Sequence, residues 1–588
     1  MFGFFDVLCF ACYNGSKDSF GGINMLYPIT NDKRLTISLN GLWKFKFVDQ
    51  HYVPDRPLKD FRLMAVPGSY NDLMTTLEER DYVGSVCYEH EITVPKRNGI
   101  WHLRVGAAPH HAKVYINGKL LSEHEGGYLP IDIALPDGIN QFRISIILDN
   151  RLTLDSFPMG EIIQKDGKEI QSINFDFYNY IGLHRNVFIY QIPHQHIRDI
   201  IVKSDLKDQQ GLLSYEILTD DDILSITLID PQGKKVGKLK NKKDVFIIKK
   251  PFLWDIGKGN LYTLDVKTAH DHYTLTCGIR KVEIIDHKLF LNHREIYLRG
   301  FGMHEDHITI GKGSLSSHNL KDFELLKWIH ANSFRTSHYP YDEEMYDLAD
   351  QYGILVINEI PAVGLNFWSP RAVFNDQTVG KQSLEYYKNM FDELIARDQN
   401  HPSIIMYSLA NEANTHEENA VSYFTEIVHH ARTKTDLPLM IVEYVSAEQN
   451  KVAQLFDVVG LNRYMAWYSD FGDLSVIEKD LTKAIQDYLM KFNKPVVITE
   501  FGADTIAGFH SLPSLAFSEE YQDDFITKYL DTIEKIDGVI GTHLWNFADF
   551  QTKQGLTRII GNKKGVFTRD RQPKMVAHTL KKRWGIEK

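Results

Sequence analysis

Two glutamates, Glu412 in "SLANEAN" and Glu500 in "VVITEFG", each stand at the end of a short apolar run. Apolar neighbours limit the hydration of a carboxylate, which tends to raise its pKa. Two such carboxyl groups facing one another can cleave a glycosidic bond, because one protonates the leaving oxygen while the other attacks the anomeric carbon or activates water. A single glutamate of this kind is more often a helix cap or an arginine partner, so the interpretation depends on the fold bringing both together.

A basic segment, residues 558–574, is the second candidate for chemistry. It holds six cations and one acid, Asp570, although the whole chain carries a formal net charge of −11. The acidic chain, with a pI near 6.1, argues against a general nucleic-acid binder, which needs a basic face. The segment is therefore either a solvated loop or a site for a small anion. Its cations are Arg558, Lys563, Lys564, Arg569, Arg571 and Lys574.

Disulfide and metal chemistry receive little support. Four cysteines are far too few for a disulfide scaffold in a chain of 588 residues. The stretch "HEDH" (304–307) could be mistaken for a metal cluster, but four consecutive ligand-type residues cannot all face one ion on an extended chain. We expect a hydrogen-bonded structural turn there, no metal and no cofactor.

The second half of the chain alternates apolar runs with helix-length amphipathic segments. This alternation predicts a (β/α)8 barrel, whose catalytic groups lie at the C-terminal ends of its strands. Glu412 follows the fourth run and Glu500 the seventh, so a barrel places both at one mouth. The second and fifth runs are short or only partly apolar. The runs are 295–301, 331–336, 353–358, 403–409, 438–444, 456–462, 495–499 and 538–545. The helix candidates include 320–330, 341–352, 382–397, 418–433 and 518–535.

The first half consists of short alternating runs typical of strands, with few helical periods before residue 190. A second β stretch follows, with a length that suits a small sandwich. We therefore divide the chain into 25–190, 191–283 and 284–588. Residues 1–24 lack a cationic n-region and an A-x-A site, so we expect a disordered extension or an upstream start rather than a signal peptide. The sequence contains no run of 18 apolar residues, so we expect no membrane span. The default compartment is the cytoplasm.

Several motifs occur together along nearly the whole chain. They are "SLNGLWKF", "FDFYNYIGLHR", "RTSHYPY", "NHPSIIMYSLANE", "LNRYMAWY", "ITEFGADTIAGFH", "LWNFADF" and "GNKKGVFTRDRQPK". In this combination the chain resembles glycoside hydrolase family 2, and within it the bacterial β-glucuronidases. The resemblance implies a jelly-roll sugar-binding domain, an immunoglobulin-like β-sandwich and a catalytic TIM barrel, which agrees with the β, β, βα order of the elements.

The resemblance also implies roles for the two chemical candidates. Glu412 becomes the acid/base and Glu500 the nucleophile of a reaction that retains configuration. Asn562 and Lys564 match an Asn-x-Lys motif that contacts the C6 carboxylate of glucuronides, and Arg558 matches a further contact. An ammonium beside an amide donor suits a carboxylate in a confined pocket, and a neutral sugar would leave the lysine buried and unpaired. The other cations are expected to face solvent: Lys563, Arg569 and Arg571.

Further pocket residues follow from the resemblance alone. Asn411 holds the sugar's 2-hydroxyl, Tyr464 contacts Glu500, and Asp176 reaches in from the first domain to a sugar hydroxyl. The remaining residues line the pocket: His338, Asn462, Tyr468 and Trp545. Taken singly, such aromatic and histidine residues more often belong to a core.

Two other functions stay open. A β-galactosidase of the same family is disfavoured by Asn562, Lys564 and the modest chain length. A carbohydrate-binding protein that has lost catalysis receives no support from the sequence, because both carboxylates are present. The expected partner is a small-molecule or oligosaccharide β-glucuronide, with no nucleic acid or membrane, and the resemblance suggests a homotetramer.

Segment 365–392, which contains Phe367 and Trp368, is shorter than the long active-site loop of some relatives and leaves the aglycone preference open.

Overall fold

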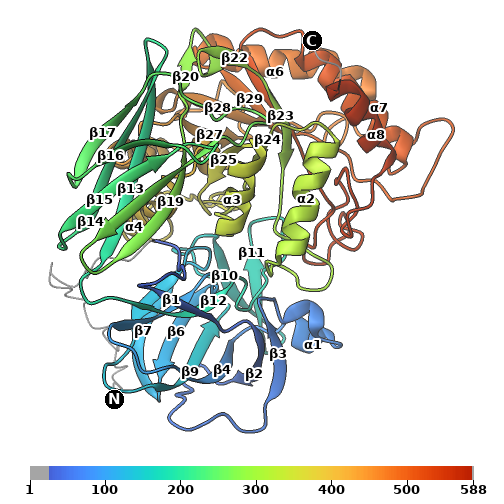
Figure 1. Ribbon diagram of the computed structural model, residues 1–588. Helices are drawn as coiled ribbons and strands as arrows, with labels where there is room; N and C mark the ends of the chain where they lie inside the picture. Colours follow the sequence, from blue (N-terminus) through green and yellow to red (C-terminus); the bar gives the residue numbers. More distant parts are fainter. Residues whose placement is uncertain (1–25, 586–588) are drawn as a thin grey trace.

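The computed structural model describes residues 26–585. Figure 1 shows two β-rich regions, blue and green, packed against a barrel whose helices run from yellow to red. The prediction for residues 1–24 lies outside the described residues. Within the described part, no helix has the length and apolar character needed to cross a membrane.

The N-terminal region pairs a six-stranded antiparallel sheet, in the order β3-β2-β4-β9-β6-β7, with a four-stranded sheet, β1-β12-β5-β8. Large apolar side chains from both sheets, among them Trp43, Leu103 and Ile144, are buried in one core. Alternate residues of each strand face that core, which explains the period of two in the sequence. The strands are β1 (Leu35–Ser38), β2 (Gly41–Val48), β3 (Arg62–Val66), β4 (Ser85–Thr93), β5 (Ile100–Val105), β6 (His111–Ile116), β7 (Lys119–Glu125), β8 (Ile131–Ala134), β9 (Gln141–Asp149) and β12 (Val187–Ile192). Two short helices lie between β3 and β4, η1 (Asn71–Leu73) and α1 (Leu77–Arg80).

A hairpin leaves this region between β9 and β12 and brings the chain to the barrel. Its strands are β10 (Gly160–Lys165) and β11 (Lys168–Ile173). At its base, the backbone N–H of Met159 donates to the carbonyl of Val363 in the barrel (3.4 Å). The residues after β11 therefore reach the barrel mouth, although they belong to the first third of the sequence.

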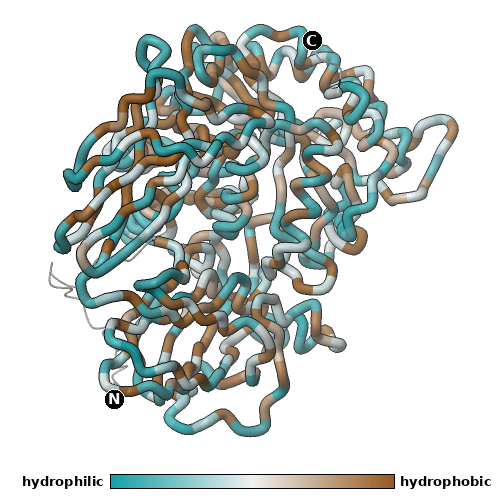
Figure 2. The backbone as a smooth tube through the Cα atoms, viewed as in Figure 1, coloured by the Kyte–Doolittle hydropathy of each residue, from teal (hydrophilic) through white to brown (hydrophobic). Residues whose placement is uncertain are grey.

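The central region is a second pair of antiparallel sheets, β13-β14-β17 and β16-β15-β18-β19. Their facing side chains, including Leu213, Ile226 and Tyr262, form a separate buried core. Figure 2 shows hydrophobic and hydrophilic residues alternating along these strands, as sheets with one solvated face require. The strands are β13 (Ile197–Lys207), β14 (Gln210–Thr219), β15 (Ile223–Ile229), β16 (Lys235–Leu239), β17 (Lys243–Ile248), β18 (Leu261–Thr268) and β19 (His272–Gly278).

The rest of the chain forms a closed barrel of eight parallel strands, preceded by a small sheet of β20 (Val282–Ile285), β21 (Lys288–Leu291) and β22 (Arg294–Ile296). Each of the eight predicted runs contributes one strand, including the short β24, so the predicted barrel is confirmed. The barrel strands are β23 (Leu298–Gly302), β24 (Ser333–Arg335), β25 (Leu355–Glu359), β26 (Ile404–Asn411), β27 (Leu439–Glu443), β28 (Val458–Asn462), β29 (Val496–Glu500) and β30 (Val539–Leu544).

Helices cover the outside of the barrel (Figure 1). Local signals fix their ends: the Asp342 carboxylate accepts from the N–H of Glu344 at the start of α3, and Gly353, with φ of 67°, ends it in the left-handed conformation. The helices are α2 (Ser316–Trp328), α3 (Glu343–Tyr352), α4 (Lys381–Asp398), α5 (Glu418–Arg432), α6 (Ile477–Phe492), α7 (Glu519–Ile533) and α8 (Met575–Trp584), with short 3-10 turns η2 (Ala453–Leu455) and η3 (Leu474–Val476).

Candidate active site

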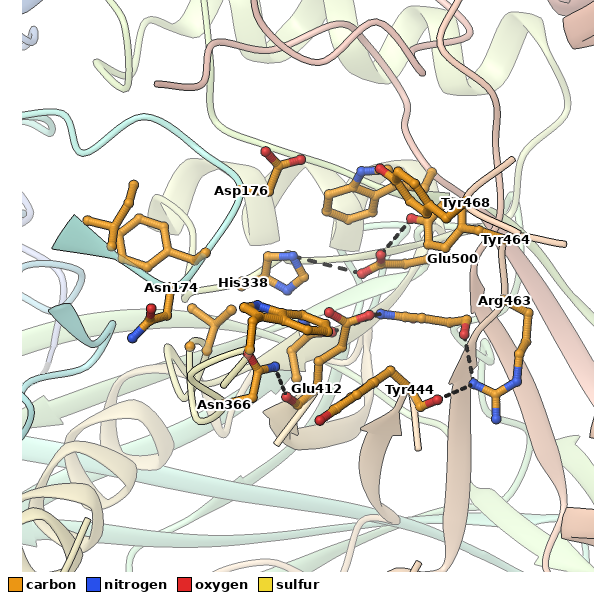
Figure 3. A pocket seen from close by; sticks show the side chains of 18 of the residues that line it. Asn174, Asp176, His338, Asn366, Glu412, Tyr444, Arg463, Tyr464, Tyr468 and Glu500 are labelled. Carbon is orange, nitrogen blue, oxygen red and sulfur yellow. Dashed lines mark hydrogen bonds and ion pairs between the residues drawn. The ribbon is translucent and has the colours of Figure 1, made fainter. Parts of the chain in front are cut away.

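A cavity of about 690 Å³ opens at the C-terminal ends of the barrel strands (Figure 3). Ten of the twelve site residues predicted from the sequence line it; Asn562 and Lys564 do not. Asp176 enters the cavity from the N-terminal region, as predicted (Figure 3). The ten are Asp176, His338, Asn411, Glu412, Asn462, Tyr464, Tyr468, Glu500, Trp545 and Arg558.

Glu500, the last residue of β29, is only 5% exposed. Its carboxylate accepts hydrogen bonds from the Arg335 guanidinium (2.6 Å) and the Tyr464 hydroxyl (2.8 Å). Burial raises the pKa of Glu500, the Arg335 charge opposes that rise, and the nearby Glu412 adds to it. The predicted contact between Tyr464 and Glu500 is therefore present (Figure 3).

Glu412 follows β26 directly and has a left-handed backbone, with φ of 53°. For a residue other than glycine this conformation costs about 1–3 kcal/mol and is often found at functional sites. Its carboxyl group accepts from the side-chain amide of Asn462 (2.8 Å), and its backbone carbonyl accepts from Asn366. Burial raises the pKa of this carboxyl group as well.

The two carboxyl groups therefore differ in their hydrogen-bond donors. A guanidinium and a phenol stabilise a negative charge on Glu500, whereas the donor that Glu412 receives is one neutral amide. Two close, buried carboxyl groups do not both ionise readily. When the pair holds one proton, Glu412 is the favoured carrier and Glu500 the favoured anion.

A fully buried pair, Arg335 and Glu359, supports this site, and the sequence interpretation gave neither a role. Arg335 donates to both oxygens of Glu359 (2.8 and 2.9 Å), and Glu359 also contacts the His338 ring (2.8 Å) and the Ser408 hydroxyl (2.7 Å). Arg335 thus bridges Glu359 and Glu500. For Glu359 the available signal was the one that pointed to Glu412, a charged residue directly after an apolar run, whereas Arg335 offered no such signal.

Lys564 and Asn562 lie behind the cavity wall, beside Arg558. Lys564 is 0% exposed; its ammonium forms an ion pair with Asp504 and donates to the Tyr468 hydroxyl (2.9 Å). Arg558 donates to the same hydroxyl (2.8 Å) and pairs with Asp176. The expectation that Lys564 is unpaired without an acidic sugar is wrong, because Asp504, four residues after Glu500, already pairs with it.

The cations around Lys564 outnumber their acidic partners. Each cation has a carboxylate oxygen within 4 Å, but Asp504 and Asp549 each serve two cations, Arg558 with Lys564 and Lys563 with Lys574. Four cations against three carboxylates leave a formal excess of one positive charge beside the cavity. We call this group the basic cluster: Arg558, Lys563, Lys564 and Lys574 with Asp176, Asp504 and Asp549.

The other cations of the 558–574 segment do not face solvent, which corrects the expectation for Arg569 and Arg571. Arg569 pairs with Asp306 (2.5 Å) and Asp72 (2.6 Å), and the buried Arg571 binds Asp322 of α2 (2.8 Å). These partners are 249 to 497 residues distant in sequence, so a local reading of charge could not find them. Lys563 is also paired, with Asp549 at 3.6 Å, although its side chain remains 26% exposed.

The "HEDH" residues contact separate partners. His304 contacts the Tyr339 hydroxyl (2.9 Å), Glu305 pairs with Arg185 (3.1 Å) and Asp306 with Arg569. Within residues 26–585, one group of side chains has the spacing of a metal site: Asp347, Asp350 and His401. Burial lowers the pKa of His401, but Asp350 outweighs this and raises it to about 9. A protonated histidine that donates to Asp350 (2.7 Å) is a poor metal ligand, so these residues fit an ion pair better.

Comparison with known proteins identifies the family. Three family profiles match in order: the glycosyl hydrolases family 2 sugar binding domain (36–193), the glycosyl hydrolases family 2 profile (195–280) and its TIM barrel domain (282–587). A β-glucuronidase of Paenibacillus borealis is 40% identical, over 95% of this chain and 98% of its own length. One from Felis catus is 37% identical, over 95% of this chain and 92% of its own.

Solved structures agree. A β-D-glucuronidase from Dictyoglomus thermophilum superposes with a TM-score of 0.92 at 43% identity, covering 96% of this chain and 99% of that chain. A β-glucuronidase from Ruminococcus gnavus in complex with D-glucuronic acid superposes with a TM-score of 0.90 at 36% identity, covering 95% and 99%. The chain therefore belongs to glycosyl hydrolases family 2.

Proposed function

We propose that this protein is a retaining β-glucuronidase, which cleaves β-D-glucuronides to glucuronate and an aglycone. The observation that carries the proposal is the basic cluster with its formal excess of one positive charge, placed beside two carboxyl groups of unequal hydrogen bonding. A substrate that brings one carboxylate balances this excess, and a neutral hexoside does not. The relatives named above, one of them a complex with D-glucuronic acid, support the same substrate class.

The reaction proceeds in two displacements. In the first, the Glu500 carboxylate attacks the anomeric carbon while Glu412 donates its proton to the glycosidic oxygen, so the aglycone leaves as a neutral alcohol or phenol. In the second, Glu412 accepts a proton from water, the resulting nucleophile attacks the anomeric carbon, and Glu500 is released as a carboxylate. Arg335 and Tyr464 hold Glu500 in position for both steps.

Substrate recognition is divided between residues of the basic cluster, at and behind the cavity wall, and the rest of the cavity lining. We assign the C6 carboxylate to Lys564, Asn562 and Arg558, with the Tyr468 hydroxyl between the two cations. Binding there requires the ligand carboxylate to share these cations with Asp504 and Asp176, which already contact them. The hydroxyl groups and the ring are assigned to the remaining predicted residues: Asn411 at the 2-hydroxyl, Asp176 at a further hydroxyl, and His338, Asn462 and Trp545 around the sugar.

The two-sheet arrangement of each β region supports two finer proposals about architecture. The first region is a jelly roll spanning 25–190, and the second is an immunoglobulin-like sandwich spanning 191–283, ahead of a catalytic barrel at 284–588. We also propose a cytoplasmic homotetramer that uses no cofactor and binds no nucleic acid, on the basis of the family resemblance and the acidic composition.

Retention makes a geometric prediction. The carboxyl groups of Glu412 and Glu500 should lie about 5–5.5 Å apart in the liganded enzyme, whereas inversion needs roughly 6.5–9.5 Å. Proton NMR during turnover of a β-glucuronide should show the β-anomer of glucuronic acid first. Initial release of the α-anomer would rule out double displacement.

The substrate assignment is tested with 4-nitrophenyl β-D-glucuronide, β-D-glucoside and β-D-galactoside. The native protein should hydrolyse the glucuronide far faster than both neutral substrates. Lys564→Ala should lower kcat/KM on the glucuronide about 10²- to 10⁴-fold, without a parallel fall on the glucoside. Asn562→Ala should follow. Lys563→Ala removes one charge of the basic cluster, but its ammonium pairs with Asp549 whereas that of Lys564 contacts Tyr468, so its effect should be the smallest of the three.

Lys564→Ala also removes the closer of the two cations that pair with the buried Asp504, so the variant should be less stable than the native protein. Kinetics are therefore measured well below its melting temperature. Faster hydrolysis of the galactoside would favour the β-galactosidase alternative. Absence of hydrolysis with all three substrates would favour a binding protein.

A further inference from the structure

The mouth of the cavity carries a tryptophan that no catalytic step above uses. Trp368 is 64% exposed, yet it lines the cavity, and its backbone is left-handed with φ of 48°. A bulky residue rarely adopts this conformation, and such positions are often found in binding loops. The Trp368 ring lies 5.0 Å from the ring of Tyr444, which also lines the cavity, with 53° between the planes. The two rings form an aromatic surface at the entrance.

This surface is tied to the acid/base residue rather than to the basic cluster. Asn366, two residues before Trp368, donates to the carbonyl of Glu412 (Figure 3). The carbonyl of Leu365 accepts from the N–H of Asn414 (2.9 Å), and the hydroxyl of Tyr444 donates to the side chain of the same asparagine (2.8 Å). Both rings are thus held against the chain segment that carries Glu412.

The proposed mechanism determines which part of the substrate lies at this aromatic surface. Glu412 protonates the bond to the leaving group, so the aglycone departs on its side of the cavity, while the glucuronate ring faces Glu500 and the basic cluster. The cavity lining also includes apolar side chains, among them Ile173, Val363 and Met465. A flat, apolar group can stack on such a surface, whereas a sugar in this position would need polar partners for its hydroxyl groups.

We propose that Trp368 and Tyr444 form a leaving-group subsite that selects β-glucuronides of flat aromatic alcohols. This inference rests on the β-glucuronidase function proposed above. The loop that carries Trp368 also contacts the N-terminal hairpin through an exposed ion pair between Arg371 and Glu161 (3.3 Å). The shorter 365–392 segment thereby serves as a platform beside the cavity.

The test compares kcat/KM for 4-nitrophenyl β-D-glucuronide with kcat/KM for methyl β-D-glucuronide, in the native protein and in Trp368→Ala. Stacking on one aromatic ring contributes enough for about a tenfold loss on the aryl substrate, with less than about a twofold change on the methyl substrate. Trp368→Phe keeps an aromatic face and should recover most of the loss. Phe509→Ala removes another exposed aromatic side chain (45%) outside the cavity and should change neither value.

The outcomes separate this inference from the proposed function. Hydrolysis of both glucuronides by the native protein, with equal losses for both in Trp368→Ala, would overturn the aromatic subsite and leave the β-glucuronidase function intact. A selective loss on a glucuronide whose aglycone is a sugar, with no loss on the aryl substrate, would also overturn it in favour of an oligosaccharide. If the native protein hydrolysed no glucuronide, both proposals would fall.

Discussion

Among single residues, the division of labour between Glu412 and Glu500 follows from their hydrogen-bond donors, because burial raises the pKa of both carboxyl groups. Glu500→Ala should abolish turnover of every substrate, because it removes the nucleophile. Glu412→Ala should retain most activity on phenols that leave without protonation, since the first step then needs little acid assistance. The measurement is kcat/KM across aryl glucuronides of graded phenol pKa. Equal losses on good and poor leaving groups would contradict the assignment.

The pH dependence of activity follows from the same pair. An acid acts in its protonated form, so kcat/KM falls as the pH rises through the pKa of Glu412. Burial raises that pKa, which extends activity to higher pH than an ordinary glutamic acid allows. In Glu412→Gln the alkaline limb should disappear from the profile of kcat/KM on 4-nitrophenyl β-D-glucuronide. A profile whose alkaline limb is unchanged in this variant would assign it to another group.

The sequence identified side chains more reliably than their partners. Glu412 and Glu500 could be found because each closes an apolar run, and the pocket residues followed from motifs. Asp504 and Arg335 were missed, because a role that consists of pairing with a residue far along the chain leaves no local trace. The same limit explains the error over Arg569 and Arg571, whose acids come from other elements.

For the secondary-structure elements, the sequence predicted the barrel well for a physical reason. Strands of a parallel barrel are buried on both faces, so most of them appear as continuous apolar runs. The three-residue β24 has one apolar side chain, Phe334, and was recognisable by its place between two helical segments. The sequence could not show that the β10–β11 hairpin would reach the barrel mouth, because its course depends on contacts such as that of Met159 with Val363.

The segment after β30 contains a testable contact between elements. Arg571 is 6% exposed and forms two hydrogen bonds with Asp322 of α2 (2.8 and 3.0 Å). Arg571→Ala leaves the Asp322 carboxylate buried without this partner, which should lower the free energy of unfolding by about 3–5 kcal/mol. Urea unfolding followed by circular dichroism measures the change. Arg198→Ala, which breaks an exposed pair with Asp220, is the control and should leave the midpoint unchanged. A similarly small shift for both variants would show that Arg571 does not anchor this segment.

Across the whole molecule, the active site depends on the packing of the N-terminal region against the barrel. Asp176 reaches the cavity from the first region, and buried pairs such as Arg185 with Glu305 (3.1 Å) connect the two regions. Uncharged histidines lie in the same contact zone: burial lowers the pKa of His110 to about 4 and holds those of His184 and His304 well below the ordinary value. These groups make the contact sensitive to acid.

The contact zone should lose stability as the pH falls. A histidine whose pKa is lowered by folding stays neutral in the folded protein but takes up a proton in the unfolded chain below about pH 6.5, so stability is lost as the pH falls. Each histidine contributes a loss of about 1.4 kcal/mol for each pH unit below that value. The melting temperature should therefore be lower at pH 5.5 than at pH 7.5. Activity should be lost on heating in the same unfolding transition. His184→Gln removes one of these groups, and its side chain does not line the cavity, so the variant should show a smaller fall over the same interval. If the variant lost as much stability as the native protein, the acid sensitivity would have to arise elsewhere in the molecule.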